Sequence, residues 1–150
     1  MPFVQRLIVF LAVGVFLVGC GGEEDLAASG PGAAQVRLLE NIYGGEFSRA
    51  WANLHPAHQA VAPRERFVAC SQQVAPRGKL ESIEVLDVFD DDASIRGIRT
   101  GEVRAVRLRV TSFDGESDTF VNHAVRFGDR WRWVLNARSF RAYQRQRCPR

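Results

Sequence analysis

The sequence predicts an α+β fold in which N-terminal helices pack on an antiparallel β-sheet. Three observations support this class. The apolar residues follow a helical period between residues 36 and 76, and the period changes to two from residue 80 onward. Two turn signals, Asp114-Gly115 and Gly128-Asp129, divide the second part into hairpins. Helices followed by an antiparallel meander are typical of α+β domains.

Three amphipathic segments predict the helices. The first ends at Gly44-Gly45 and the second at Pro56, because glycine and proline stop helices. The third begins at Pro63, a residue favoured in a first turn, and Pro76-Arg77-Gly78 ends it. Their apolar faces are Val36, Leu39, Ile42 and Tyr43; Phe47, Ala50, Trp51 and Leu54; and Phe67, Cys70 and Val74.

Four alternating segments predict the strands. The first contains Ile83 and Val85, although Leu86 and Val88 have the opposite parity, and it ends at the acidic turn 90–92. The second, third and fourth cover 106–110, 121–127 and 131–135. The stretch 95–101 is ambiguous between a bulge and a short edge piece, and a polar, arginine-rich tail closes the chain.

The first nineteen residues predict an export signal. Arg6 precedes an apolar run of twelve residues, 7–18, which is too short to cross a bilayer. The following Gly19-Cys20 and the small, acidic residues after it resemble the lipobox of bacterial lipoproteins. The resemblance implies export, cleavage before Cys20, thioether lipidation of Cys20 and acylation of the new N-terminus. An uncleaved anchor helix is the alternative.

The length and charge left after residue 19 fit one small domain. The 131 remaining residues include a segment, 20–34, rich in Gly, Ala, Ser and acid, which predicts the lipidated cysteine and a flexible tether. The domain is expected over 35–150. Past Asp25, 19 basic residues face 14 acidic ones, a mild surplus of +5 that is consistent with contact to anionic envelope polymers or with ordinary surface charge. Nucleic acid is not expected as a partner of an exported domain.

The cysteine count fits an oxidising compartment. If lipid consumes Cys20, Cys70 and Cys148 remain as an even pair, and we expect them to form a disulfide.

From about Val36 to Tyr143 the chain resembles nuclear-transport-factor-2-like (NTF2-like) domains, also called SnoaL-like or cystatin-like. The segment Tyr43–Trp51 is similar to that family's turn between the first two helices, and Leu54-His55-Pro56 to the end of its second helix. The final Gly128–Trp133 hairpin is similar to its C-terminal motif. The resemblance implies a cone of three helices around a strongly curved sheet, a fold used by enzymes and binding modules alike, with dimers common.

Enzymes of this fold use an acid or a histidine in the cone, which singles out three candidates here. His123 shares the apolar face of its strand with Val121, Val125 and Phe127 and would point into the cone if that face lines it. Tyr43 is the one hydroxyl partner, and Asp87 is the weakest candidate. The competing interpretation of His123 is a hydrogen-bonded histidine at the core edge.

Other candidate groups carry weaker signals. His55 and His58 lack a third ligand at recognisable spacing, so neither a metal nor a cofactor is expected. Trp51, Phe67 and Trp133, with His123, either line a ligand pocket or fill the core. The arginines 107, 109, 126, 132 and 138 form a basic sheet face that either binds an anionic partner or is solvated.

The expected function is therefore a lipoprotein on a bacterial membrane, facing the periplasm or the exterior, whose domain binds a small apolar ligand or an envelope protein without chemistry. An isomerase- or cyclase-type enzyme using His123 is the first alternative, and a passive envelope scaffold is the second. A homodimer is compatible with each of them.

Overall fold

The computed structural model describes residues 25–28, 30–74 and 79–150. The predicted signal peptide and the predicted lipidation site Cys20 lie outside the described residues. None of the described helices has the length and apolar character needed to cross a membrane.

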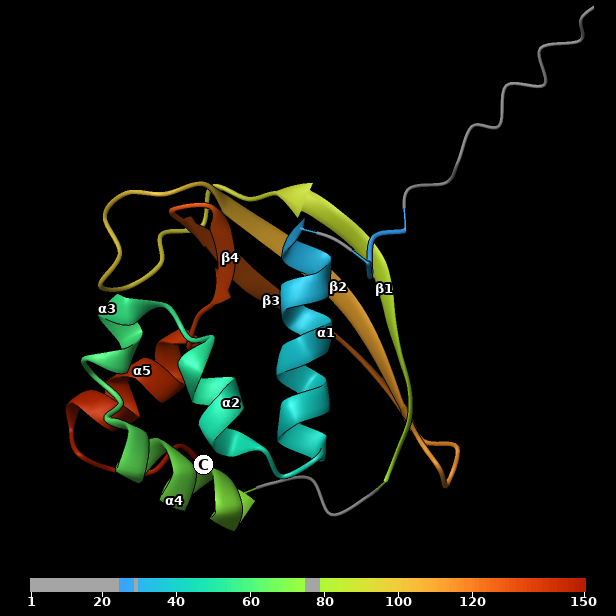
Figure 1. Cartoon of the computed structure of the whole chain (residues 1–150), viewed down its shortest axis with the longest axis horizontal. Coiled ribbons are helices and arrows are strands. Elements are labelled where there is room, and N and C mark those ends of the chain that lie inside the picture. Colours follow the sequence, from blue (N-terminus) through green and yellow to red (C-terminus); the bar gives the residue numbers. More distant parts are fainter. Residues whose placement is uncertain (1–24, 29, 75–78) are drawn as a thin grey trace, which may run out of the picture.

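Four helices precede a four-stranded sheet, and a fifth helix follows it (Figure 1). The helices of the first half are α1 (Gly30–Tyr43), α2 (Phe47–Ala52), α3 (Pro56–Gln59) and α4 (Arg64–Val74). The strands are β1 (Leu80–Asp90), β2 (Val103–Ser112), β3 (Ser117–Phe127) and β4 (Arg130–Trp133), and α5 (Ala137–Gln144) closes the domain. The predicted α+β class is confirmed.

The sheet is an antiparallel meander of order β1-β2-β3-β4. A register shift between Val85 and Asp87 inserts Leu86 as an extra residue in β1. This bulge explains the conflicting parity of β1, because it places Ile83, Val85 and Val88 opposite the β2 residues of one face.

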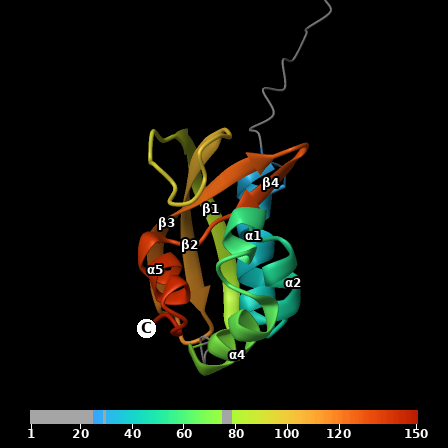
Figure 2. The same cartoon turned by 90° about the vertical axis from the view of Figure 1, so that its left-hand side faces the viewer.

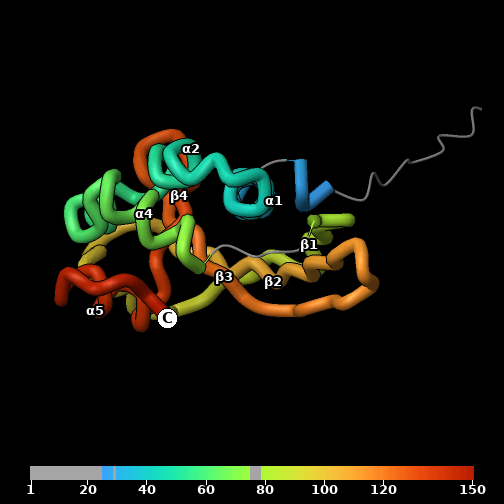
Figure 3. Tube along the Cα trace, turned by 90° about the horizontal axis from the view of Figure 1, so that it is seen from below, coloured from blue at the N-terminus to red at the C-terminus, as the bar shows by residue number. Residues whose placement is uncertain are grey.

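Helix α1 covers one face of the sheet, so helices and strands form two layers (Figure 3). Leu39 of α1 packs with Val106, Leu108 and Val110, which alternate along β2 and are almost completely buried. The face of β2 that points toward α1 is thereby fixed.

The second core cluster is aromatic and lies between the helices and the end of the sheet. Trp133 of β4 is buried against Phe67 of α4 with ring centroids 5.8 Å apart, and its indole N–H donates to the carbonyl of Ala50 at 2.8 Å. The other buried members of this aromatic core are Leu38, Phe47, Leu54, Ala62, Cys70, Leu135, Phe140 and Tyr143.

The C-terminal segment, expected as a polar tail, instead forms α5. Phe140 and Tyr143 are three residues apart, which places both on one face of a helix, and both are buried in the aromatic core. The remaining positions of α5 are small or polar, so two aromatic residues alone make a short pattern in the sequence. Asn136 begins the helix by accepting a hydrogen bond from the Ser139 N–H.

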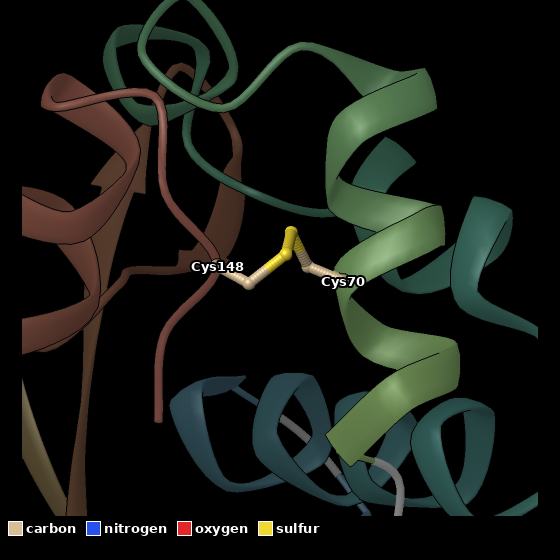
Figure 4. The surroundings of a disulfide bond; sticks show 2 residues. All are labelled: Cys70 and Cys148. Atoms are coloured by element: carbon tan, nitrogen blue, oxygen red, sulfur yellow. A yellow bond between two sulfur atoms is a disulfide. The ribbon is translucent and has the colours of Figure 1, made fainter.

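A disulfide joins Cys70 of α4 to Cys148, with Cα atoms 5.2 Å apart, as the cysteine count predicted (Figure 4). It connects two segments that are 78 residues apart in sequence and holds the segment after α5 against α4.

The predicted tether overlaps the first helix, because α1 begins at Gly30 rather than after residue 34. Gly32, Ala33 and Ala34 are buried. A Cβ on Gly32 would stand 1.8 Å from the carbonyl oxygen of Leu26, so the small residues here serve close packing. A stretch that composition alone describes as a linker is thus part of the domain from residue 30 onward.

Candidate functional site

A cleft of about 380 Å³ opens at the edge of β3. One wall is β3 itself at residues 121–123, and the other is the segment 134–139 that leads from β4 into α5. The β1–β2 loop contributes residues 93–96, and Leu38 of α1 lies at the base. We call this feature the β3 cleft.

His123 lines the β3 cleft and forms an ionisable pair with Asp91, which precedes the lining residues 93–96. Nε2 of His123 lies 2.7 Å from Oδ2 of Asp91, and the side chains are 27% and 34% exposed. The hydrogen bond from His123 is the main cause that holds the pKa of Asp91 below its usual value. Because an ionised carboxylate only accepts, Nε2 of His123 carries the proton and donates it.

The second ring nitrogen of His123 is free for chemistry. With Nε2 protonated, Nδ1 of the neutral ring carries a lone pair, and no described residue donates to it. A histidine oriented by a carboxylate and open at its other nitrogen is the arrangement of a general base. Part of its surface nevertheless faces water, so the pair lacks the closed environment that acid–base enzymes of this kind use.

Helix α1 fixes the main chain at His123. Gln35 is fully buried, and its side-chain amide donates to the carbonyl oxygen of His123 at 2.8 Å. Its oxygen accepts from the amide of Asn122 at 3.2 Å. A buried amide with both ends satisfied holds β3 against α1, and so holds His123 at the edge of the cleft.

The side chain of His123 points away from α1. Its partner on β2 is Ala105, which alternates with the α1-facing Val106, whereas Asn122 is the β3 residue opposite Val106. The apolar face predicted for β3 is therefore not the one that faces α1. Val125 is buried all the same, and Phe127 is half exposed.

The other two acid–base candidates do not join His123. Tyr43 lies eight residues beyond Gln35 on α1, about 12 Å along the helix axis, and packs beside Leu80 and Ile83. Asp87 lies 3.7 Å from Arg107 in an ion pair on the outer face. Neither residue lines the β3 cleft.

The tryptophans and Phe67 fill space rather than enclose it. Phe67 and Trp133 are buried in the aromatic core, and Trp51 packs against this core with its indole N–H donating to the carbonyl of Ala62 at 2.7 Å. Of the four residues predicted for a pocket, Trp133 and His123 line the β3 cleft, whereas Trp51 and Phe67 do not.

His55 and His58 serve the local backbone. His58 is fully buried: its Nδ1 accepts the Leu135 N–H at 2.9 Å, so its Nε2 donates to the carbonyl of Arg96 at 2.8 Å. Burial lowers the pKa of His58, and that of His55, whose Nδ1 accepts the Ala57 N–H. Within the described residues, no three side chains of suitable type gather to hold a metal ion.

Asp91 and Gln35 are the site residues that sequence reasoning missed. Asp91 lies in an acidic triplet that we interpreted as a turn, yet its parity continues that of Phe89, which lies opposite Ala105, the partner of His123. Parity combined with strand register would have found it. Gln35 is the first residue of the domain as predicted, directly after the predicted tether, and no local signal identifies it.

A nucleophile paired with a base is not formed in the part of the chain that the structure describes. Ser94 and Ser139 line the β3 cleft, but His123 makes its hydrogen bond to Asp91 and none to a serine. Both described cysteines are consumed by the disulfide. The geometry therefore offers a histidine base with a carboxylate partner, but no serine or cysteine nucleophile beside them.

Comparison with solved structures identifies a protein with a similar architecture. A crystal structure at 2.00 Å resolution of a Campylobacter jejuni protein, described as a candidate NTF2-like transpeptidase, superposes with a TM-score of 0.53. The match covers 72% of this chain and all of the other one. The domain has the NTF2-like fold.

The match does not assign an activity to this NTF2-like domain. Sequence identity to the Campylobacter protein is 10%, which is a similarity of fold, and the transpeptidase description is that protein's own. No family model matches the chain, and no curated protein matches its sequence. The functional conclusion therefore depends on the residues of the β3 cleft.

Proposed function

We propose that the protein is a bacterial envelope lipoprotein, anchored by lipid on Cys20, whose NTF2-like domain binds an extended peptide segment of an envelope protein without chemistry. The observation that carries the binding proposal is the unpaired edge of β3 along the β3 cleft. β4 pairs only with residues 124–127 of β3, so the edge from 117 to 123 has no neighbouring strand among the described residues.

The alternation of an antiparallel ladder indicates which backbone groups are free. The Arg126 N–H donates to Glu102 on the β2 side, so the even-numbered residues of β3 bond to β2. Thr119, Val121 and His123 then direct their main chain to the open edge, where the carbonyl of His123 already accepts from Gln35. An open edge beside a cleft is the feature that strand addition uses.

The filled interior argues against the other kind of ligand. The space between helices and sheet is occupied by the aromatic core, led by Phe67 and Trp133. A small apolar ligand would have to displace this close-packed core, whereas an extended peptide needs only the surface cleft. The cleft combines apolar Leu38 and Ile95 with polar Asn136 and His123, which suits alternating side chains.

A passive scaffold acting through a basic sheet face has less support. Arg107 pairs with Asp87, and Arg109 lies 3.0 Å from Glu84. Acidic residues of β1 therefore compensate Arg107 and Arg109, and the predicted Arg138 lies on α5 instead of on the sheet.

The anchoring part of the proposal is supported by the sequence. The apolar run 7–18 and the small residue before Cys20 support the anchor, and residues 21–24 separate Cys20 from the turn at 25–28 that lies beside the start of α1. Replacing Cys20 with serine should leave an unprocessed, unlipidated precursor in bacterial membranes, detected by mass and palmitate labelling. Normal maturation of that variant would contradict the anchor.

The binding part is tested by site-specific photo-crosslinking in the full chain expressed in a bacterial envelope. A photoreactive residue in place of Val121, 43% exposed on the open edge, should give discrete adducts with one partner protein. The matched control replaces Phe113, which is 68% exposed at the far hairpin. Identical adducts at both positions, or none at 121, would sink the proposal, and an adduct with a second copy would identify a dimer edge instead.

An acid–base enzyme is the second candidate, favoured by the 2.7 Å contact between His123 and Asp91. Such an enzyme would use Nδ1 of His123 to remove a proton beside a carbonyl group. Conversion of β,γ-unsaturated ketones to their conjugated isomers, followed by ultraviolet absorbance, should then occur and be lost in His123→Gln. Absence of turnover across a panel of such ketones would leave peptide binding as the function.

A further inference from the structure

A second hollow lies at the opposite end of the domain from residue 25. Its volume is about 720 Å³, and its walls are α5, the segment after α5 and the end of α4. We call it the arginine cleft, because its lining includes Arg138, Arg141, Arg145, Arg147 and Arg150, together with Gln73.

Two covalent and conformational constraints hold the segment after α5 in place. Gln146 has a positive φ of 57°, and the Arg147 N–H donates to the carbonyl of Ala142 at 2.9 Å, which reverses the chain at the end of α5. The disulfide from Cys148 to α4 then fixes the segment two residues past the reversal (Figure 4). Arg147 and Arg150 are thereby kept on the same hollow as the arginines of α5.

The arginines of this cleft differ from Arg104, Arg107, Arg109 and Arg126 of the sheet, because they have no acidic partner among the described residues. On the sheet, Arg104, Arg107, Arg109 and Arg126 each lie within 4.0 Å of a carboxylate. None of the five cleft arginines forms an ion pair with any residue that the structure describes. Five like charges around one hollow repel each other, and a bound anion would relieve that repulsion.

We propose that the arginine cleft binds an anion that carries two or more phosphate groups. The planar guanidinium fork matches phosphate oxygens in pairs, and several arginines on different segments can each take one group. The volume lies within the range of sites for small molecules, so the cleft has room for more than one phosphate.

The position of the cleft favours a phosphate source other than the anchoring membrane. The segment 25–28, drawn in blue, and the end marked C lie at opposite ends of the domain in both side views (Figures 1 and 2). If Cys20 is anchored as proposed above, the end that contains the segment 25–28 faces the membrane. The arginine cleft then faces away from the headgroups, toward soluble phosphates or phosphate-bearing polymers.

Calorimetric titration of the full-length chain with inorganic tripolyphosphate tests the proposal. The variant Arg141→Gln/Arg145→Gln removes two charges from the cleft, and the control Arg107→Gln/Arg109→Gln removes two charges from the sheet. Wild type and control should bind with similar affinity, and the cleft variant about tenfold or more weakly. Equal weakening in both variants, or no binding by wild type, would overturn the proposal.

Two further arms keep the outcome decisive. Thermal unfolding checks that each variant is folded. If the double variant does not fold, Arg141→Lys replaces it, because lysine keeps the charge but lacks the planar guanidinium fork. Arg141→Lys should weaken tripolyphosphate binding, and unchanged binding would count against the site. Co-sedimentation of the unlipidated Cys20→Ser chain with phosphatidylglycerol vesicles distinguishes the source. Vesicle binding that depends on Arg141 and Arg145, without tripolyphosphate binding, would overturn the proposal in favour of headgroups. Because no arm requires the β3 cleft, failure here is separable from failure of peptide binding.

Discussion

His58 and His123 lie in two regions of the domain that use the same side chain in different ways. His58, in the helical end, is fully buried, and both ring nitrogens bond to main-chain groups from distant segments. His123, at the β3 cleft, is partly exposed, with one nitrogen on Asp91 and the other open. A saturated, buried ring stabilises the fold, whereas an open, oriented ring is available to a ligand. The comparison assigns stability to the helical end and agrees with the proposal that a ligand binds at the cleft.

The largest expected effect comes from the aromatic core. Phe67→Ala should lower the free energy of unfolding by about 3–5 kcal/mol, because it leaves a cavity against Trp133 and Tyr143. Urea unfolding measures the loss. Phe113→Ala, which removes a ring of the same size from an exposed position, should change stability by no more than about 0.5 kcal/mol. Similar losses in both variants would contradict the contrast between core and surface.

The next effect concerns the disulfide of the helical end. Cys148→Ser should cost about 2–5 kcal/mol, because the bond constrains a long loop of the unfolded chain. Thermal unfolding of oxidised wild type against the variant measures this difference. Wild type treated with reductant should approach the variant, and a variant as stable as oxidised wild type would show that the bond adds no stability.

A smaller effect separates the histidines by their response to pH. Burial lowers the pKa of His58 below 6.5, so the unfolded chain binds a proton there at a higher pH than the folded chain does. Stability should therefore be full above about pH 6.5 and should fall as the pH drops below it. His58→Gln should cost about 1–3 kcal/mol at pH 7 through unsatisfied main-chain groups and should flatten the acid slope. If the acid dependence of stability is unchanged in His58→Gln, other titrating groups cause it. The variant His55→Gln measures the contribution of His55 to the same dependence.

The smallest effect on stability is expected at the cleft. His123→Gln and Asp91→Asn should change the free energy of unfolding less than the core, disulfide and His58 variants above, since both side chains are partly exposed and water screens their interaction. In wild type, nuclear magnetic resonance should give Asp91 a pKa below 3.8, and in His123→Gln the pKa should return toward 3.8. If the pKa of Asp91 is the same in wild type and in His123→Gln, the His123–Asp91 pair does not form in solution. A loss of stability comparable to Phe67→Ala would remove the distinction between the two regions.

The parts of the fold that repeat along the chain could be predicted from the sequence. Periods of 3.6 and 2 identified α1, α2, α4 and the four strands, and glycine and proline gave their ends. The pairing of Cys70 with Cys148 followed from the number of cysteines left after Cys20. The helices and strands depend on residues close together in the sequence, and the cysteine pairing depends on the number of cysteines, so both can be predicted without the fold.

Features that depend on distant partners were not predictable in the same way. The role of Asp91 requires the register of three strands, and the bulge at Leu86 changes parity within one of them. The burial of His58 depends on Arg96 and Leu135, which approach it only in the folded domain. In α5 two aromatic residues among arginines are too few for a periodic signal, so their burial shows only in the structure.

The packing of α1 also determines when the chain can fold. The first helix lies against the last strand, and Gln35 holds its partners Asn122 and His123 from 87 and 88 residues away. A growing chain therefore cannot complete this domain before β4 is made, because part of the surface that α1 covers belongs to β4. Cys70 must wait as a free thiol until Cys148 arrives. The consequence is that the N-terminal helix and the C-terminal half reach their final packing together, late in synthesis.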